Sequence, residues 1–372
     1  MSPMRCSSCG TRYAYALDSC TLCGAPLYAE SVASGTALAV TRIETPSRNH
    51  ETVPYWVVLV QDSNGAVSIA KSEREISAGD AFAVGERPKL DRTIGVLGYG
   101  VMGCGLVELL VLKGARVVWW GRAEERLARG RERVFDRLAR SLDEAQMLEA
   151  AQRVSCSTSM QSLADCDLVI EAVVEDFDEK AAVLLAAEAH MAPAAILATN
   201  TSSLSIDALA ARLARPERFG GLHFFNPPVR MQLVETVSSA ATAPEVHGEL
   251  DDYAVSLGKA PVRVAAAPGF VVNRALMKLL NEAVREMEES VASPDQIDKA
   301  IRLGLNHPMG PLELADLIGI DVVVSIMDDL AARLGDESYA PRPLLLEMIE
   351  RGDLGRKTGR GFFAYESHPA TG

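Results

Sequence analysis

Apolar runs alternating with turn residues divide the chain into an N-terminal stretch that is predicted to be all-β and a longer part that alternates strands with helices. In the longer part, T-I-G-V-L at 93–97 is predicted to be a buried parallel strand, and C-G-L-V-E-L-L-V-L-K at 104–113 is predicted to be a helix. Gly114 ends this helix, and A-R-V-V-W-W at 115–120 is the next strand. Together these elements form a βαβ unit.

Further apolar runs predict three more strands, at 167–174, 194–199 and 219–225. The charged stretch 123–152 predicts one long helical region, and after Pro268-Gly269 the pattern is helical to about residue 351. Strands alternating with helices, followed by helices alone, indicate an α/β fold. We predict a Rossmann-type doubly wound domain at 89–267 and an all-helical C-terminal domain at 268–372.

The N-terminal stretch contains β-branched runs separated by turn residues. They predict strands at 36–43, 54–61, 66–70 and 78–84. Asp62-Ser-Asn-Gly65 has the composition of a hairpin turn. We predict a small OB-like β-barrel at 31–88, joined to the α/β domain by the polar, Pro-containing segment 86–91.

Four cysteines near the N-terminus are spaced as a metal site. Cys6 and Cys9 form one Cys-x2-Cys knuckle, and ten residues later Cys20 and Cys23 form a second; a glycine follows each knuckle. This spacing fits a tetrahedral four-thiolate zinc site, which is structural because it leaves no open coordination position. We predict a zinc ribbon at 1–30 that depends on the metal for folding. The alternative is a chance pair of knuckles, or disulfides.

Composition narrows the functional class. The chain has 372 residues, a net charge of −13 and 48% hydrophobic residues. Basic and acidic residues nearly balance in the predicted ribbon and barrel, so nucleic acid is not expected as a partner. No apolar run approaches the roughly 20 residues that span a bilayer, and the N-terminus has no signal-like segment. We expect a cytoplasmic protein without a membrane partner, in which Cys104, Cys156 and Cys166 are reduced thiols.

The turn after the first strand of the α/β domain, G-Y-G-V-M-G, has the spacing of a dinucleotide-binding loop. Gly98 permits the tight turn, Gly100 lets a pyrophosphate approach the backbone, and Gly103 lets helix and strand pack closely. Val101 and Met102, in the same turn, precede the helix whose N-terminus faces the phosphates, and we expect them to contact the cofactor. The alternative is a glycine-rich turn without a ligand.

Residues 92–366 resemble the 3-hydroxyacyl-CoA dehydrogenases, including the 3-hydroxybutyryl-CoA dehydrogenases. The shared motifs occur in order: V-L-G-Y-G-V-M-G, V-I-E-A-V-V-E-D, A-T-N-T-S-S-L-S-I, R-F-G-G-L-H-F-F-N-P, L-V-E, P-G-F-V-V-N-R, H-P-M-G-P-L-E-L-A-D and G-R-K-T-G-R-G-F-F-A-Y. The resemblance implies an oxidoreductase of fatty acid metabolism that interconverts (S)-3-hydroxyacyl-CoA and 3-oxoacyl-CoA with NAD or NADP. It also implies a homodimer formed through the helical domain.

The resemblance assigns four catalytic residues. His223 is the acid/base that exchanges the hydroxyl proton as hydride leaves the same carbon, a task suited to imidazole near neutral pH. Glu235 orients His223, while Ser202 and Asn273 donate hydrogen bonds to the substrate oxygen. Taken singly, each residue also has a purely structural interpretation. His223 would be a core histidine, Glu235 a solvated strand carboxylate, Ser202 a helix cap and Asn273 a turn residue.

Cofactor contacts follow from the same resemblance. Glu175 and Lys180 match family positions on the nicotinamide-ribose side, and Asn226 and Lys357 match others. The alternative is that Lys180 and Lys357 are surface lysines.

This chain departs from the family pattern at two places. The second strand should end in an acidic residue that binds the ribose 2′-hydroxyl of NAD, but Gly121 stands there and Arg122 follows. A guanidinium suits a 2′-phosphate, so NADP is favoured over NAD; the alternative is an NAD enzyme that lacks this contact. In the CoA-binding region, Arg137 and Glu144 stand near the positions of a family Ser and Lys. An arginine-rich face there could hold CoA phosphates, with Arg137 as a substrate contact, or could be an ordinary solvent face.

The N-terminal pattern resembles the zinc-ribbon/OB-fold proteins found beside acyl-CoA enzymes, notably thiolases. A thiolase or ketosynthase partner is therefore expected. Two alternatives to an acyl-CoA dehydrogenase remain. One is a dehydrogenase of a carrier-protein-bound acyl group or a free hydroxy acid, and the other is a non-catalytic acyl-CoA-binding scaffold for a thiolase-like partner.

Overall fold

The computed structural model describes residues 92–365 without a break. Before them it describes 4–6, 12–13, 27–29, 35–43, 55–61, 67–72, 77–79 and 81–82. The chain divides into two compact units, Met1–Lys89 and Leu90–Gly372, each of which is described by itself.

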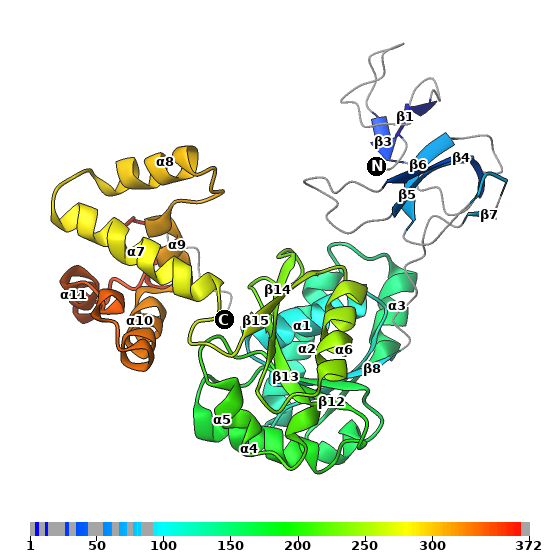
Figure 1. Ribbon diagram of the computed structural model, residues 1–372, viewed down its shortest axis with the longest axis horizontal. Helices are drawn as coiled ribbons and strands as arrows, with labels where there is room; N and C mark the ends of the chain where they lie inside the picture. The colour runs from blue at the N-terminus through cyan, green and yellow to red at the C-terminus, as the bar shows by residue number, and fades with distance from the viewer. Residues whose placement is uncertain are drawn as a thin grey trace. The chain divides into compact units, whose positions relative to one another are not determined.

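The first unit contains two small antiparallel sheets (Figure 1). The larger sheet has the order β6-β5-β4-β7 and consists of β4 (Gly35–Ile43), β5 (Tyr55–Gln61), β6 (Val67–Ser72) and β7 (Ala81–Phe82). The smaller sheet has the order β2-β1-β3 and consists of β1 (Met4–Cys6), β2 (Arg12–Tyr13) and β3 (Leu27–Ala29). The strands predicted at 36–43, 54–61 and 66–70 are therefore present, whereas the one predicted at 78–84 is described as a strand only at 81–82, since 78–79 form a turn. β5 and β6 pair as a hairpin would, although the turn at 62–65 lies outside the described residues.

The predicted zinc site also lies outside the described residues. Cys9, Cys20 and Cys23 are not described, and Cys6 is described only as part of a strand. Within the described ranges, no group of three His, Cys, Asp or Glu side chains is placed to hold a metal ion.

The second unit is built on one eight-stranded sheet (Figure 1). In spatial order its strands are β10 (Val154–Ser157), β9 (Arg116–Trp120), β8 (Thr93–Leu97), β11 (Leu168–Glu171), β12 (Ile196–Thr199), β13 (Phe219–Phe224), β14 (Leu233–Ser238) and β15 (Ala260–Ala265). The first six are parallel and follow the 3-2-1-4-5-6 order of a Rossmann fold. β14 runs antiparallel to β13 and parallel to β15.

Helices cover both faces of this sheet. One face carries α1 (Val101–Leu112), α2 (Glu124–Leu138), α3 (Glu144–Arg153) and α6 (Pro244–Ser256); the other carries α4 (Phe177–Glu188) and α5 (Ile206–Ala210). The region predicted at 123–152 is helical, but it is not one continuous helix. Two helices form instead, because Asp143 begins the second with a capping box that Gln146 completes.

The strand predicted at 167–174 is shorter than expected. β11 ends at Glu171, whose side chain accepts a hydrogen bond from the Val173 N–H at 2.6 Å. The Lys180 ammonium donates to the Val173 carbonyl at 3.2 Å, so both backbone groups of Val173 bond to side chains rather than to a neighbouring strand.

The C-terminal part of the second unit is helical, as predicted. Its helices are α7 (Val272–Glu288), α8 (Pro294–Gly304), α9 (Pro311–Ile318), α10 (Ile320–Leu334) and α11 (Pro343–Arg351). They pack around a separate core that includes Met277, Leu280, Val323 and Met327. In the described ranges, no helix has the length and apolarity that crossing a membrane requires.

Candidate active site

The glycine-rich turn follows β8 at the point where the strand order reverses, between β8 and β11. Gly98 has a φ of +110°, and a Cβ there would lie 2.5 Å from the Ala172 carbonyl oxygen. A Cβ at Gly103 would lie 2.2 Å from the Gly98 carbonyl oxygen. The Trp119 indole donates to that same oxygen at 2.7 Å. Both glycines are therefore required by the close approach of the backbone.

Gly100 differs from the other two glycines. It is the N-cap of α1, makes no side-chain cap, and has no atom within 4 Å of a built Cβ. The N-terminus of α1 therefore has no side-chain acceptor at its first N–H groups and opens on free space. Such an end of a helix is suited to hold an anionic phosphate group.

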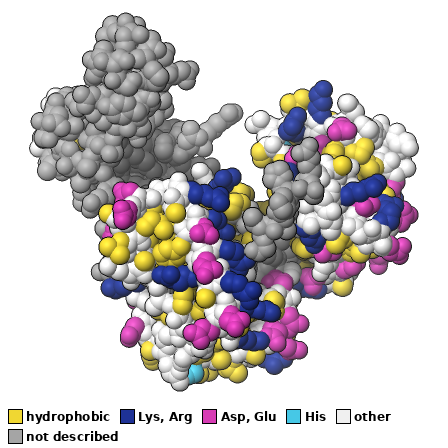
Figure 2. All heavy atoms as spheres, turned by 180° about the vertical axis from the view of Figure 1, so that it is seen from behind, with side chains coloured by type: hydrophobic (Ala, Val, Ile, Leu, Met, Phe, Trp, Pro, Cys, Tyr) yellow, Lys and Arg dark blue, Asp and Glu magenta, His cyan; other side chains and the backbone are white. Residues whose placement is uncertain are grey.

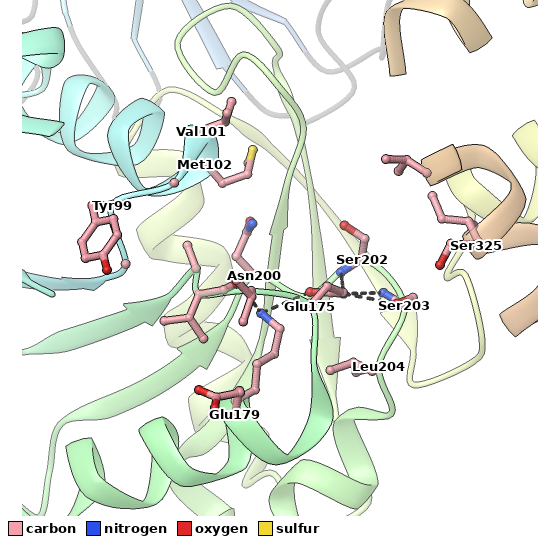
Figure 3. Close-up of a pocket in the computed structure, with 18 of the residues that line it drawn as sticks. Tyr99, Val101, Met102, Glu175, Glu179, Asn200, Ser202, Ser203, Leu204 and Ser325 are labelled. Carbon is pink, nitrogen blue, oxygen red and sulfur yellow. Dashed lines mark hydrogen bonds and ion pairs between the residues drawn. The ribbon is translucent and has the colours of Figure 1, made fainter. Parts of the chain in front are cut away.

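A cavity of about 850 Å³ opens in front of this turn (Figure 3). Its lining includes Val101 and Met102 from α1, and Gly121 and Arg122 after β9. Glu175 from the loop after β11, Lys180 from α4 and Ser202 from the loop after β12 also line it. The volume, the open Gly100 and the uncapped helix end fit a dinucleotide.

The end of β9 lacks a carboxylate, as the sequence indicates, but another element supplies one. The Arg122 guanidinium lies 2.6 Å from the Glu179 carboxylate, which projects from α4. The Tyr99 ring occupies the place of a side chain at Gly121, since a Cβ there would meet the ring at 2.4 Å. Tyr99 and Glu179 both line the cavity.

Lys180 is buried, with 1% of its side chain exposed, so its interpretation as a surface lysine is wrong. Its ammonium group lies 2.7 Å from Glu171 and 3.1 Å from Glu175. The second oxygen of Glu171 accepts a hydrogen bond from the Thr199 hydroxyl at 2.6 Å. The buried Lys180 ammonium is stabilised by the two carboxylates beside it, and the buried Glu171 carboxylate is stabilised by Lys180 and by the Thr199 hydroxyl.

Glu175 joins this network to the loop that carries Ser202. Its Oε1 accepts hydrogen bonds from the Ser202 N–H at 2.8 Å and the Ser203 N–H at 3.2 Å, and from the Thr201 hydroxyl. Burial on its own would raise the pKa of Glu175, but Lys180 and these donors together lower it. Glu175 is therefore a fixed anion that holds the Ser202 loop against the cavity (Figure 3).

His223 and Glu235 form a buried pair, 4% and 1% exposed. The histidine Nδ1 lies 2.7 Å from Oε2 of Glu235, and the rings of Phe225 and Phe270 lie against the imidazole at centroid distances of 4.5 and 5.6 Å. Because Glu235 is buried, its interpretation as a solvated carboxylate is wrong. Desolvation would raise the pKa of Glu235, but the bond to His223 and two backbone N–H groups lower it.

Those two N–H groups belong to Val271 and Val272, at the start of α7, and each lies 3.0 Å from Oε1 of Glu235. The next residue, Asn273, lies in the first turn of α7 and donates its side-chain amide to the Ser202 carbonyl at 3.4 Å. The start of α7 thus connects Glu235 to the Ser202 loop. Asn273 is a helix residue rather than a turn residue, and the cap of the nearby helix α5 is Ser205 rather than Ser202.

The remaining predicted residues are placed less centrally. Asn226 is exposed just after β13. Lys357 lies 2.6 Å from Asp321, and it is Asp321 that lines the cavity. Arg137 is half-buried on α2, where its Nε lies 2.6 Å from Glu108 of α1. Arg137 does not line this cavity.

Four residues of the site were not assigned from the sequence: Tyr99, Glu171, Glu179 and Asp321. Glu171 had a readable signal, since a carboxylate within the apolar run L-V-I-E-A-V-V must be paired if it is buried. Glu179 and Asp321 had none, because each reaches the cavity from a helix surface that only the fold brings there.

Comparison with known proteins agrees with this geometry. Residues 93–267 match the model of the 3-hydroxyacyl-CoA dehydrogenase NAD binding domain, and residues 269–365 match that of the 3-hydroxyacyl-CoA dehydrogenase C-terminal domain. A probable 3-hydroxybutyryl-CoA dehydrogenase of Deinococcus radiodurans is 42% identical over 275 residues, which are 73% of this chain and 99% of that protein. A 3-hydroxybutyryl-CoA dehydrogenase of Bradyrhizobium diazoefficiens is 41% identical over 74% of this chain and 95% of its own length.

A solved structure shows the same similarity. The crystal structure of (S)-3-hydroxybutyryl-CoA dehydrogenase from Ralstonia eutropha superposes with a TM-score of 0.71 and 40% identity, over 74% of this chain and all of the other. The buried His–Glu pair, the dinucleotide-type cavity and both family models therefore agree that this chain belongs to the 3-hydroxyacyl-CoA dehydrogenase family.

Proposed function

We propose that the protein interconverts (S)-3-hydroxyacyl-CoA and 3-oxoacyl-CoA, with short acyl groups such as 3-hydroxybutyryl as the first candidates. The observation that carries this proposal is the buried His223–Glu235 pair, whose carboxylate also binds the first N–H groups of α7. A non-catalytic scaffold would have no need for a desolvated base and carboxylate held this closely.

His223 acts through Nε2. Because Nδ1 faces the Glu235 carboxylate at 2.7 Å, the proton on Nδ1 is donated to Glu235 and Nε2 is left as the basic nitrogen. Nε2 takes the hydroxyl proton of the substrate in the oxidative direction and returns a proton to the ketone oxygen in the reductive direction. Glu235 stabilises the imidazolium that forms in between. The bound nicotinamide supplies the hydride acceptor or donor.

Ser202 and Asn273 are proposed to bind the substrate oxygen. They approach each other from two elements, since the Asn273 amide contacts the Ser202 carbonyl at 3.4 Å. Glu175 fixes the Ser202 backbone at 2.8 Å, which keeps the Ser202 hydroxyl in place without using it. Donors fixed in this way stabilise the charge that develops on the substrate oxygen.

The test is reduction of acetoacetyl-CoA with NADPH and with NADH in parallel. The reaction is monitored by the loss of absorbance of the reduced nicotinamide. Wild-type turnover that His223→Ala abolishes, with cofactor binding intact, supports the proposal. Full activity in His223→Ala would disprove the role of His223 as acid/base. Failure with acetoacetyl-CoA but turnover of a carrier-bound or free 3-oxo acid would change the substrate and keep the reaction.

For the cofactor, we propose NADP(H) in preference to NAD(H). The support is the pairing of Gly121, which has no side chain, with the partly exposed guanidinium of Arg122 on the cavity wall. Gly98, Gly100, Val101, Met102 and Gly103 would hold the phosphates. Glu175, Lys180, Asn226 and Lys357 are proposed for the nicotinamide side, where Lys180 acts through Glu175 and Lys357 through Asp321.

For the thioester, we propose CoA, recognised by arginines of α2. Four lie on α2 at spacings of three or four residues and share one side of the helix: Arg126, Arg129, Arg133 and Arg137. Arg122 precedes the helix and Arg140 follows it. Basic side chains also form a band on one face of the molecule (Figure 2). Of these six, Arg122 and Arg137 have ion-pair partners, which leaves guanidinium groups available for phosphates. A KM for acetoacetyl-CoA that rises in Arg133→Gln, but not for a pantetheine analogue, is the expected result.

For the N-terminal unit, we propose a zinc ribbon at 1–30 and an OB-like barrel at 31–88, ahead of domains at 89–267 and 268–372. The unit precedes the first residue matched by the family models, and its cysteine spacing is that of a four-thiolate site. Cys6→Ser should lose bound zinc, measured by elemental analysis, without abolishing hydride transfer. A thiolase or ketosynthase is the proposed partner of this unit.

We also propose a homodimer formed through the helical domain, and a cytoplasmic location. Free thiols at Cys104, Cys156 and Cys166 suit a reducing compartment. Light scattering that gives the mass of a single chain would refute the dimer.

A further inference from the structure

Glu179 occupies an unexpected place in the cavity. It lies in the first turn of α4, where its N–H is held by the Asp176 carboxylate at 2.9 Å, and its own carboxylate reaches 2.6 Å from the Arg122 guanidinium. Both side chains are about half exposed, at 46% and 54%, and both line the cavity. Figure 3 labels Glu179 among the lining residues.

The position of this ion pair determines what it can touch. In a Rossmann fold, the end of the second strand faces the ribose 2′ position of the dinucleotide. That strand is β9, and it ends at Gly121 and Arg122. Because the Tyr99 ring fills the space beside Gly121, a carboxylate cannot come from β9 without moving that ring. Glu179 supplies a carboxylate at the same place from another element.

The other carboxylates of the cavity are engaged elsewhere. Glu175 binds Lys180 and the Ser202 loop, Asp321 binds Lys357, and Asp329 binds Arg333. Glu179 is the lining carboxylate that pairs with Arg122.

We propose that Glu179 is a specificity-determining residue that sets the balance between NAD(H) and NADP(H). This inference rests on the proposed placement of Arg122 at the ribose 2′ position. With a 2′-hydroxyl, the Glu179 carboxylate accepts a hydrogen bond from the ribose and keeps Arg122 neutralised. With a 2′-phosphate, Glu179 competes for Arg122 and repels a group that carries nearly two negative charges. Arg122 favours NADP(H), and Glu179 opposes it.

The test measures the equilibrium dissociation constants of NADPH and of NADH from the quenching of protein fluorescence. Glu179→Gln keeps the size of the side chain and removes its charge. Its matched control is Asp178→Asn, which removes one negative charge from the neighbouring, exposed position that does not line the cavity. We expect Glu179→Gln to shift the ratio of the two dissociation constants toward NADPH by about tenfold, as expected for relief of a carboxylate–phosphate repulsion in partly screened surroundings. Asp178→Asn should leave the ratio unchanged.

Arg122→Gln separates this inference from the proposed cofactor preference. Weaker NADPH binding in Arg122→Gln supports the preference, and an unchanged ratio in that variant overturns it. An unchanged ratio in Glu179→Gln overturns the role of Glu179, whatever Arg122→Gln does. In the double variant Arg122→Gln/Glu179→Gln, NADH binding should still be weakened by Glu179→Gln, because the lost hydrogen bond to the ribose 2′-hydroxyl does not depend on Arg122.

Discussion

His223 and Glu235 are direct cross-strand partners on the antiparallel strands β13 and β14, and the imidazole Nδ1 lies 2.7 Å from the carboxylate. Partners at such a position have closely spaced Cβ atoms on the same face of the sheet, so the pairing of the strands itself aligns base and carboxylate. The second carboxylate oxygen holds the N-terminus of α7. The Glu235 side chain therefore links His223, the proposed acid/base, to the helix that carries Asn273.

Replacing Glu235 should separate its two contributions. Glu235→Gln keeps an oxygen for the Val271 and Val272 N–H groups but loses the charge that orients and stabilises His223. We expect kcat for acetoacetyl-CoA reduction to fall by about 10²-fold or more, with a smaller loss of stability than in Glu235→Ala. Glu235→Ala should lose activity and also lower the melting temperature, because it leaves two backbone donors without a partner. Equal melting temperatures for the two variants would contradict this account.

The lowered pKa of Glu235 predicts how stability changes with pH. Because the folded-state pKa lies below its ordinary value of 4.5, the carboxylate stabilises the fold at any pH above that value. This contribution is lost as the pH falls through the lower, folded-state pKa. The difference in unfolding free energy between wild type and Glu235→Gln should therefore be constant near neutrality and shrink in acid, as measured by urea denaturation at a series of pH values. A difference that grew on acidification would have the wrong sign.

The glycines of the turn after β8 should respond differently to the same change. Gly103→Ala places a methyl group 2.2 Å from a backbone oxygen, so we expect marked loss of stability together with loss of dinucleotide binding. Gly100→Ala meets no atom within 4 Å and should fold normally, yet its methyl group enters the space proposed for the pyrophosphate. Its melting temperature should match wild type while its affinity for NADH and NADPH falls. Unchanged affinity would remove the pyrophosphate from this position.

The buried Lys180 should matter more to stability than an exposed lysine. Lys180→Met leaves Glu171 buried without its cation, a change that typically costs about 3–5 kcal/mol. Lys299→Met is the control, since Lys299 is exposed and should change stability by no more than about 0.5 kcal/mol. Thermal or chemical unfolding of the two variants measures the difference. Similar values would mean that the pair with Glu171 contributes little.

Much of the α/β fold was predictable because its signals are local. The strand at 93–97, the glycine turn and the following helix are encoded in one continuous stretch, and the structure confirms them. The boundary between α2 and α3 was missed because an apolar and charged pattern continues across it. α2 ends at Leu138, and the capping box at Asp143 begins α3.

The candidate site also combines features that are encoded locally with contacts that are not. The alternation of strands and helices and the family motifs that contain His223, Glu235, Ser202 and Asn273 can be read directly from the chain. Which side chains meet depends on how distant elements pack: Glu235 contacts the start of α7, Lys180 lies between two carboxylates, and Glu179 pairs with Arg122. A motif specifies local geometry, whereas a charged side chain on a helix surface pairs with a residue of whichever element packs beside it.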